Sequence, residues 1–392
     1  MKKLFILTLG LVFGVSIAYA GPHTSKVLYD RSPVRKAIVL PQVDGLNCYT
    51  ADLHVHTIYS DGNITPEERV LEAWIDGLDI LAITDHIETR KGERAMLKFL
   101  KGYAQDKEKG FEPINTRCSR GVPADERGIV SDLNYSVSLA QQAAKAYPEL
   151  TIIKGAEISR EPVHIGHYCA LFTKDNNTIY STDDAQTIRN ARAQGAIITH
   201  NHPGWERTST NYTEFEKKIY AEGLIDGIEI SNSRNFYPEI VRRAIEKKLY
   251  MVSATDCHKS TASIFGHQDF FRDMTLIFAK DKSEKELRKS LLSQKTLGYC
   301  GGYIIGEESL LEKFFKASVT ATYSGKSKKG NNIILTNSTS IAYTLNDNGR
   351  IIHLPAHSSA SVTLTSGKAK FSVENMYHVD EKHPVFELKI NK

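Results

Sequence analysis

The chain has 392 residues, of which 41% are hydrophobic, and its 50 basic and 46 acidic residues give a net charge of +4. This length suits one large domain and a small one. The two signs of charge are mixed along the chain, without the basic stripe that nucleic-acid-binding proteins use, so the composition gives no support to a nucleic-acid partner.

The first twenty residues have the organisation of a secretory signal peptide. Lys2 and Lys3 precede a short apolar run, and Ala18-Tyr19-Ala20 ends the segment before Gly21. The run is too short for a comfortable membrane span, and no second apolar stretch is long enough to hold the chain in a bilayer. We therefore expect cleavage near Ala20 and export to the periplasm or the medium, without a membrane span.

Residues 21–46 are polar and contain proline, and we expect them to lie on the surface as an approach segment. The next stretch, Asp52-Leu53-His54-Val55-His56, predicts a strand. Side chains alternate along a strand, so Asp52, His54 and His56 would share one face. Two imidazoles on one face are half of a metal site, although such a pair also occurs in strands that bind nothing.

Strand and helix signals then alternate. A hydroxyl N-cap at Thr65, proline at Pro66 and glutamate at Glu68 predict a capping box and a helix to about Ile75. Apolar runs predict strands over residues 78–84, 151–157, 163–172, 196–199, 227–231, 249–255 and 274–279. Further helices are predicted over residues 133–147, 185–194, 214–222, 238–248 and 283–292.

Two stretches depart from this alternation. Residues 91–131 lose periodicity and predict a helical excursion at 92–107 and an irregular loop at 118–128, of the kind that shapes a site. From residue 318 the sequence turns to period-two alternation with Gly turns, which predicts a small, β-sandwich-like domain over 318–392. The part before it is expected to be an α/β barrel or doubly wound sheet that binds ligands at the carboxyl ends of its strands.

Metal-ligating residue types stand at or near the ends of most of these strands. Imidazole nitrogens and carboxylate oxygens suit Zn²⁺, Mn²⁺ and Fe²⁺, and one carboxylate can bridge two ions. The positions are His54 and His56, Asp85 and His86, Glu157, His167, His202, and Asp256 and His258. Because ligands of several strands would meet at one edge, the pattern predicts a metal cluster.

Five ordered motifs carry a family resemblance: DLHVHTIYSDG, ITDH, GAEIS, NHPG and ATDCH. Over about residues 50–300 the chain resembles the PHP (polymerase and histidinol phosphatase) superfamily of metal-dependent phosphoesterases, in particular exported bacterial phosphodiesterase-like members. The resemblance implies a distorted seven-stranded β/α barrel over residues 47–317. It also implies two or three divalent transition-metal ions, of Mn, Zn or Fe.

The resemblance also implies how the ligands are shared. One ion would be held by His54, His56, Glu157 and Asp256, a second by Glu157, His167 and His202, and a third by Asp61, His86 and His258. Asp61 stands where some relatives have a third histidine and can still ligate through oxygen. His164 is an alternative to His167. We favour His167 because Gly166-His167-Tyr168 resembles the variant of exported relatives.

Other polar residues near the motifs have more than one interpretation. Asp85 is better read as an acceptor that orients a ligand histidine than as a ligand. Arg160 would neutralise a substrate phosphate through its planar fork, or else form a surface ion pair. His200 is read as a hydrogen-bonded neighbour of the site, and Cys257 as core packing. The five cysteines fall in no C-x-x-C spacing, which indicates neither a disulfide scaffold nor a zinc ribbon and leaves one disulfide open.

Three functions compete at this stage. The first is a phosphoesterase in which two ions share a water, lower its pKa and present hydroxide to phosphorus. A phosphodiester is the favoured substrate, with a phosphomonoesterase of histidinol-phosphatase type or an exonuclease as alternatives. The second is attack on a carbonyl carbon, which a lysine bridge among the motifs would favour, and none stands there. The third is an exported, non-catalytic binding protein. The expected partner is a small phosphate ester, and the oligomeric state is left open.

Overall fold

The computed structural model describes residues 33–88, 132–160, 162–266 and 268–392. The predicted signal peptide, the excursion at 92–107 and the loop at 118–128 lie outside these ranges. Residues 35–392 form one compact unit. Within the described ranges, no helix combines the length and the apolar character that crossing a membrane requires.

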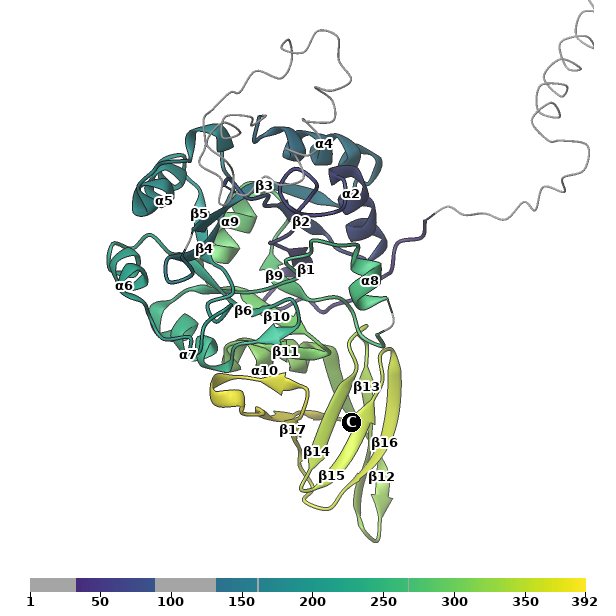
Figure 1. Ribbon diagram of the computed structural model, residues 1–392. Coiled ribbons are helices and arrows are strands. Elements are labelled where there is room, and N and C mark those ends of the chain that lie inside the picture. Colours follow the sequence, from purple (N-terminus) through teal and green to yellow (C-terminus); the bar gives the residue numbers. More distant parts are fainter. Residues whose placement is uncertain (1–32, 89–131, 161, 267) are drawn as a thin grey trace, which may run out of the picture. The chain divides into compact units, whose positions relative to one another are not determined.

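A twelve-stranded sheet forms the centre of this unit, in the order β18-β11-β10-β9-β1-β2-β3-β4-β5-β6-β7, with β8 paired to β6 (Figure 1). Its strands are β1 (Asn47–Asp52), β2 (Ile80–Ile83), β3 (Thr151–Arg160), β4 (Gly166–Leu171), β5 (Ile197–His200), β6 (Gly227–Asn232), β7 (Asn235–Phe236), β8 (Tyr250–Ala254), β9 (Met274–Ala279), β10 (Thr296–Cys300), β11 (Tyr303–Ile305) and β18 (Met376–Tyr377). The sheet curls, because hydrogen bonds from Met251 to Thr296 and from Ser253 to Tyr299 join β8 to β10. The predicted α/β class is confirmed.

Helices lie around the outside of the sheet (Figure 1). They are α2 (Pro66–Ile75), α4 (Tyr135–Ala143), α5 (Asp184–Ala193), α6 (Glu214–Ala221), α7 (Pro238–Lys247), α8 (Thr261–Phe265), α9 (Glu284–Leu292) and α10 (Glu308–Ser318). Thr65 caps α2 as expected, since its hydroxyl accepts a hydrogen bond from the amide of Glu68. Such a cap satisfies one of the orphan amides at a helix start.

The series of strands is longer and more mixed than the sequence predicted. Strands β1, β2 and β3 are parallel, whereas β4 runs antiparallel to both β3 and β5, and β9 antiparallel to β1. We expected the series to close with the helix at 283–292, but β10, β11 and α10 follow it. Strand β11 also pairs with β18 from the C-terminal part. A pairing between strands so distant in sequence leaves no local signal.

Two four-stranded sheets follow α10, in the orders β16-β13-β12-β20 and β15-β14-β17-β19. The strands are β12 (Val319–Ser327), β13 (Gly330–Asn337), β14 (Tyr343–Asp347), β15 (Arg350–Leu354), β16 (Ser358–Leu364), β17 (Ala369–Val373), β19 (Val385–Leu388) and β20 (Ile390–Asn391). Burial alternates along β14 and β17, as the period-two pattern predicted.

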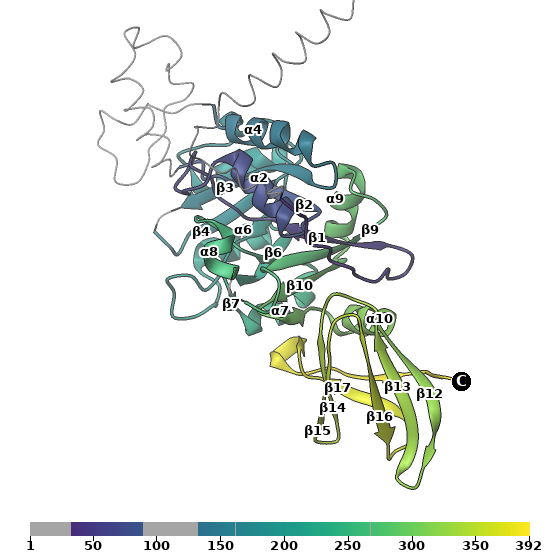
Figure 2. The ribbon, with the colours of Figure 1, turned by 90° about the vertical axis from the view of Figure 1, so that its right-hand side faces the viewer.

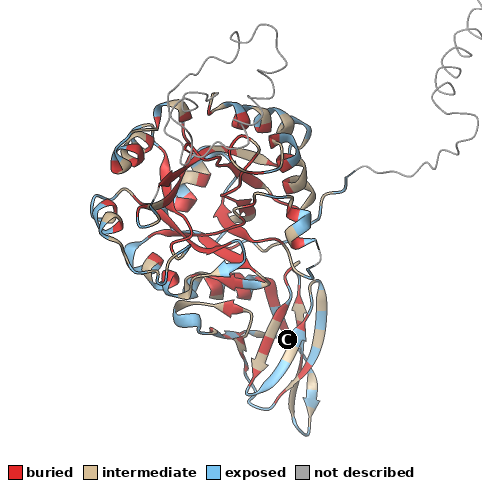
Figure 3. Ribbon diagram, viewed as in Figure 1, coloured by how far each residue is buried: buried red, intermediate tan, exposed pale blue. Residues whose placement is uncertain are grey.

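Helix α10 joins the two parts of the hydrophobic core. Its Phe314 and Phe315 are fully buried in one cluster with Phe278 of β9 and Phe371 of β17. Figure 2 shows α10 between the central sheet and the C-terminal strands, and Figure 3 shows buried residues along both. One hydrophobic core thus includes residues from both parts. The predicted boundary between two domains at residue 318 stays a prediction.

Candidate metal centre

The two histidines of the first motif lie just beyond β1, not within it. The pairing of β1 with β2 ends at Asp52, opposite Leu81. The chain nevertheless stays extended, with an isolated bridge between Val55 and Cys257. His54 and His56 therefore still share a face, as predicted, but they lie in the extended segment that follows β1 and not in the strand itself.

Three side chains from the two ends of the motif series meet at one point. The Nε2 atoms of His54 and His56 are 3.0 Å apart. Oδ1 of Asp256 lies 3.4 Å from the first and 3.0 Å from the second. All three lie within reach of a single cation. Asp256 follows β8 with a φ of 50°, a left-handed conformation that is uncommon outside glycine and often occurs at functional sites.

Glu157 lies at the middle of the histidines. Its Oε1 is 3.3 Å from His54, 3.4 Å from His167 and 3.5 Å from His202, and its Oε2 is 2.7 Å from His86. The side chain is 1% exposed. Burial raises the pKa of Glu157, but the imidazoles of His54, His86 and His167 outweigh burial and hold it well below its usual range. One carboxylate thus serves several imidazoles, as a bridging ligand would.

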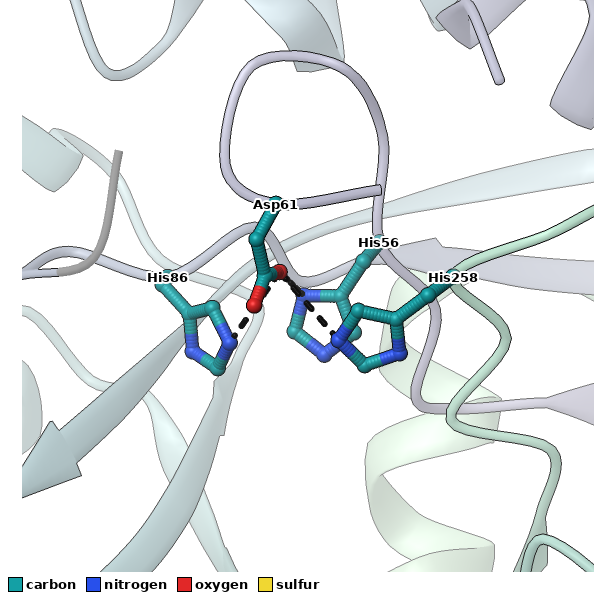
Figure 4. A group of neighbouring side chains, drawn as sticks. All are labelled: His56, Asp61, His86 and His258. Atoms are coloured by element: carbon teal, nitrogen blue, oxygen red, sulfur yellow. Dashed lines mark ion pairs between the residues drawn. The ribbon is translucent and has the colours of Figure 1, made fainter. Parts of the chain in front are cut away.

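A second group lies beside the first (Figure 4). Oδ1 of Asp61 is 3.3 Å from Nε2 of His86 and 3.2 Å from Nε2 of His258, and His56 completes the group at 4.0 Å. Burial acts to raise the pKa of Asp61, but the imidazoles of His258 and His86 beside it hold that pKa far below its usual range. The structure thus brings together Asp61, His86 and His258, the three side chains of the third predicted ion.

The candidate ligands from the middle of the chain also lie at this edge. His167 is at the amino end of β4, and β4 runs antiparallel to β3, so this end meets the carboxyl end of β3. His202 follows β5. His164, the alternative to His167, is exposed. His200 is instead bonded to the hydroxyl of Tyr220 and lies 3.4 Å from Glu216, away from the cluster.

Glu229 of β6 is a site residue that sequence reasoning missed. Its Oε1 lies 2.8 Å from Nδ1 of His54, and its Oε2 accepts hydrogen bonds from the amide of His202 at 2.6 Å and from Asn232. It is fully buried. The available signal was a carboxylate inside the apolar strand Gly227–Asn232, because buried glutamates are rare unless they are paired.

Asn201 was also missed, although it belongs to the NHPG motif. Its side-chain amide donates to Oε1 of Glu157 at 2.7 Å, and its carbonyl accepts from the amide of Cys169. Ser159 donates to the other carboxylate oxygen of Glu157. These contacts fix the orientation of the central carboxylate.

Asp85 lies next to the site and acts through other residues. It accepts hydrogen bonds from the amide and hydroxyl of Thr57, at 2.7 Å each, and from the hydroxyl of Ser60. Ser60 in turn lies 3.4 Å from Nδ1 of His56. Asp85 thus holds the turn that follows His56, and its influence on that imidazole passes through Ser60.

Arg160 is nine-tenths buried and surrounded by acceptors. Its guanidinium forms ion pairs with Glu88 at 3.1 Å and Asp184 at 3.5 Å. It also donates to the carbonyl of Ser181 and to Thr187. Of the two sequence-based interpretations of Arg160, this geometry matches the ion pair, but the pair is buried and not on the surface as predicted.

The residues of the cluster fit metal ions. Oδ1 of Asp61, Oδ1 of Asp256 and Nε2 of His167 are buried and, among the described residues, have no hydrogen-bond partner. Buried polar atoms are normally satisfied, so three unsatisfied ones in a cluster call for an explanation such as an ion. Imidazole nitrogens with carboxylate oxygens form the donor set that Zn²⁺, Mn²⁺ and Fe²⁺ accept. The groups that could each hold an ion are His56, Asp61, His86 and His258; His54, Glu157 and His202; and His54, His56 and Asp256.

Comparison with known proteins defines the class. Residues 52–225 match the model of the PHP domain family. This range begins at the first histidine motif and contains most of the cluster. Together with the fold and the cluster, the match shows that the chain contains a PHP domain.

One solved structure extends the comparison to the C-terminal part. A two-domain protein from Bacteroides vulgatus, described as containing a predicted PHP-like metal-dependent phosphoesterase, has a similar structure, with a TM-score of 0.77 at 28% sequence identity. The match covers 91% of this chain and 98% of that one, so the similarity includes the C-terminal sheets. An amidohydrolase from Chromobacterium violaceum shares 15% identity over 55% of this chain and 89% of its own, with a TM-score of 0.36. A search of curated proteins finds no match.

Proposed function

We propose that this protein is a metal-dependent phosphoesterase with a preference for phosphodiesters. The observation that carries the proposal is the position of Glu157, whose two oxygens lie within 3.5 Å of His54, His86, His167 and His202 inside a PHP domain. Such a carboxylate is suited to bridge two ions. The proposed cofactor is two or three ions of Mn, Zn or Fe.

The proposed ligands follow the sequence-based sets. These are His54, His56, Glu157 and Asp256 for one ion, Glu157, His167 and His202 for a second, and Asp61, His86 and His258 for a third. Bound ions of this kind supply Lewis acidity toward the phosphoryl oxygens and lower the pKa of water to near neutrality. The reaction would then need no nucleophilic side chain.

The protein's own residues prepare this site by fixing imidazole tautomers. Nδ1 of His54 faces Glu229, and Nδ1 of His258 faces the backbone carbonyl of Asp256 at 2.8 Å. An acceptor at Nδ1 keeps the proton there and leaves the Nε2 lone pair free to bind a cation. In both residues Nε2 is the atom that points into the cluster.

Among the described residues, little uncommitted positive charge lies near the cluster, since Arg207 beside His202 is paired with Glu216, and the preference for a diester rests on this. Arg160 is engaged by Glu88 and Asp184, and Lys259 is exposed. A monoester carries a second negative charge, which phosphomonoesterases usually grip with further basic groups. A diester carries a single negative charge, which the proposed ions can offset by themselves.

A pair of matched substrates tests this function. We expect kcat/KM for an aryl phosphodiester to exceed that for the corresponding aryl monoester when the protein is loaded with Mn²⁺, Zn²⁺ or Fe²⁺. A monoester preferred by more than about tenfold, or some 1.4 kcal/mol of transition-state discrimination, would overturn the diester assignment. Turnover of neither ester by a fully loaded protein would favour a non-catalytic binding protein instead.

We also propose export. The support is the basic start, apolar run and Ala18-Tyr19-Ala20 end of the first twenty residues. Expression of the full chain in a Gram-negative host should give a periplasmic or secreted protein whose N-terminal residue is Gly21. An uncleaved chain in the cytoplasm would contradict this.

A further inference from the structure

A second cavity lies next to the metal centre. Its volume is ≈ 570 Å³, and it is lined by Gly204 and residues 207–210, by residues 236–239 at the start of α7, and by Asp380 and Glu381 from the C-terminal part. Such a volume is typical of a small-molecule site. None of the proposed metal ligands lines this space.

Contacts tie this cavity to the proposed ligands. Gly204 comes two residues after His202, and the ring of Tyr237 packs on it so closely that a Cβ at position 204 would lie 2.8 Å from a ring carbon. Arg207 lines this cavity and also a smaller one formed by His167 and His202. Burial raises the pKa of Tyr237, and the carboxylates of Glu229 and Asp256 add to the shift, which puts this phenol within their field. A group bound here would therefore lie beside the reacting centre.

The C-terminal wall of the cavity is fixed to the central sheet. Strand β18 pairs with β11, and the Tyr377 ring stacks on Tyr303 at 4.8 Å and on Phe236 at 5.7 Å. Asp380 forms a two-oxygen ion pair with Arg242 of α7 at 2.7 and 2.6 Å. Figure 1 shows this yellow segment beside α7. The chain after residue 318 thus supplies part of the pocket.

The lining has aromatic, hydroxyl and acidic character. Phe236 and Tyr237 are the aromatic residues of the lining, and residues 208–210 carry its hydroxyls. Glu239, Asp380 and Glu381 are the acidic side chains of the lining, and Arg207 is its basic one, so the lining has a formal charge of 1 − 3 = −2. Arg207 is paired with Glu216 and Asp380 with Arg242, so among the described residues Glu239 and Glu381 supply the charge of the lining that no ion pair offsets. This environment attracts a cation, tolerates a neutral group and repels an anion.

We propose that this cavity receives an alcohol group of the phosphodiester and selects an uncharged or cationic alcohol over an anionic one. The inference rests on the proposed phosphodiesterase function and adds its substrate class. It also assigns a role to the C-terminal part, which supplies the acidic wall that sets the charge preference.

Three p-nitrophenyl phosphodiesters test the inference, with ethanol, choline or 3-hydroxypropionate as the second alcohol. For the metal-loaded protein at low ionic strength, we expect kcat/KM for the choline ester to equal or exceed that for the ethyl ester. The carboxylate ester should be at least about tenfold poorer, because two negative charges of the lining face its own.

The Glu381→Lys variant reverses one wall charge at an exposed position. In this variant, the ratio of kcat/KM for the choline ester to kcat/KM for the carboxylate ester should fall by about tenfold. This ratio does not depend on the fraction of folded protein. The matched control is Glu387→Lys on β19, which changes net charge equally but lies outside the lining, and its ratio should equal that of the wild type.

The outcomes separate the two proposals. If the wild type hydrolyses the ethyl ester but the ratio is the same in the wild type and in Glu381→Lys, the pocket assignment is wrong and the phosphodiesterase function stands. An equal shift in Glu387→Lys would also overturn the assignment, since the effect would then come from net charge. If no ester is hydrolysed with any metal, the proposed function fails and the pocket assignment fails with it.

Discussion

Histidine occurs in both halves of this molecule, and the two groups differ in arrangement. At the edge of the central sheet, His54, His56 and His86 are buried, with ring nitrogens that face one another or carboxylates. In the C-terminal sheets, His353 and His357 are exposed and lie on separate turns and strands. Histidines form a candidate metal site only where the ends of several strands bring their side chains close together.

The two regions also bury polar groups differently. Burial alternates along the strands of the C-terminal sheets, as in β17, where Phe371 is buried and Lys370 is exposed. The metal edge instead buries carboxylates and imidazoles together, which is costly unless they are paired or bound to ions. The metal edge should therefore depend on its ligands for stability and function, whereas the C-terminal sheets should not.

The largest effect is expected from Glu157→Gln. The change removes the one charge that five imidazoles approach, so we expect metal content to fall more than for any single histidine change and kcat/KM to fall at least about 1000-fold. Elemental analysis and steady-state kinetics measure the two losses. Glu374→Gln is the matched control, because Glu374 lies 3.6 Å from His383 in the C-terminal part and should be neutral in both assays. Full metal and activity in Glu157→Gln would refute the bridge.

Next in size is the contrast between two nearby histidines. His167→Ala should abolish activity, because its Nδ1 lies 3.4 Å from Glu157. His164→Ala should spare most activity, because this side chain is exposed. Steady-state assays of both variants under one metal decide between them, and the reverse pattern would move the ligand to His164.

A smaller loss is expected when a positioning residue changes. Glu229→Gln keeps the shape of the side chain but removes the charge that holds Nδ1–H of His54. Such partners of metal ligands typically contribute 10- to 100-fold to metal affinity. Competition with a chelator should therefore show that the Kd for the metal ion rises about 10- to 100-fold, while the fold stays the same. An unchanged Kd would mean that Glu229 only packs the strand.

The smallest effect is expected on the stability of the protein, from a buried carboxyl group outside the cluster. Burial raises the pKa of Asp273 from 3.8 to about 6. A raised folded-state pKa gives a contribution to stability that is fully present below about pH 4 and is lost as the pH rises through 6. Asp273→Asn can still accept the hydrogen bond from the amide of Arg234. In metal-free protein we expect this variant to be more stable than the wild type by about 1–3 kcal/mol at pH 8 and equally stable at pH 4.

Urea unfolding at the two pH values measures this difference in the free energy of unfolding. The result would contradict the account if the variant were less stable than the wild type at pH 8. An equal gain in the free energy of unfolding at both pH values would show that the packing of this side chain, and not its charge, causes the difference between the variant and the wild type.

The sequence predicted the parts of the site that depend on local pattern. The spacing of His54 and His56, the strand-end positions of His86 and His202 and the cap at Thr65 are all short-range features. Glu229 was missed because its role depends on the distance to His54, which the curl of the sheet sets and no spacing records. The pairing of β11 with β18 was missed for the same reason. Arg160 has two interpretations in sequence, and only the positions of Glu88 and Asp184 distinguish between them.

The metal content of the purified protein tests the central claim most directly. We predict two or three transition-metal ions per chain by elemental analysis, either as purified or after reconstitution with Mn²⁺, Zn²⁺ or Fe²⁺, since the ligand sets at the sheet edge can fill that many sites. At most one ion per chain, with none gained on reconstitution, would contradict the proposed cluster and the function built on it.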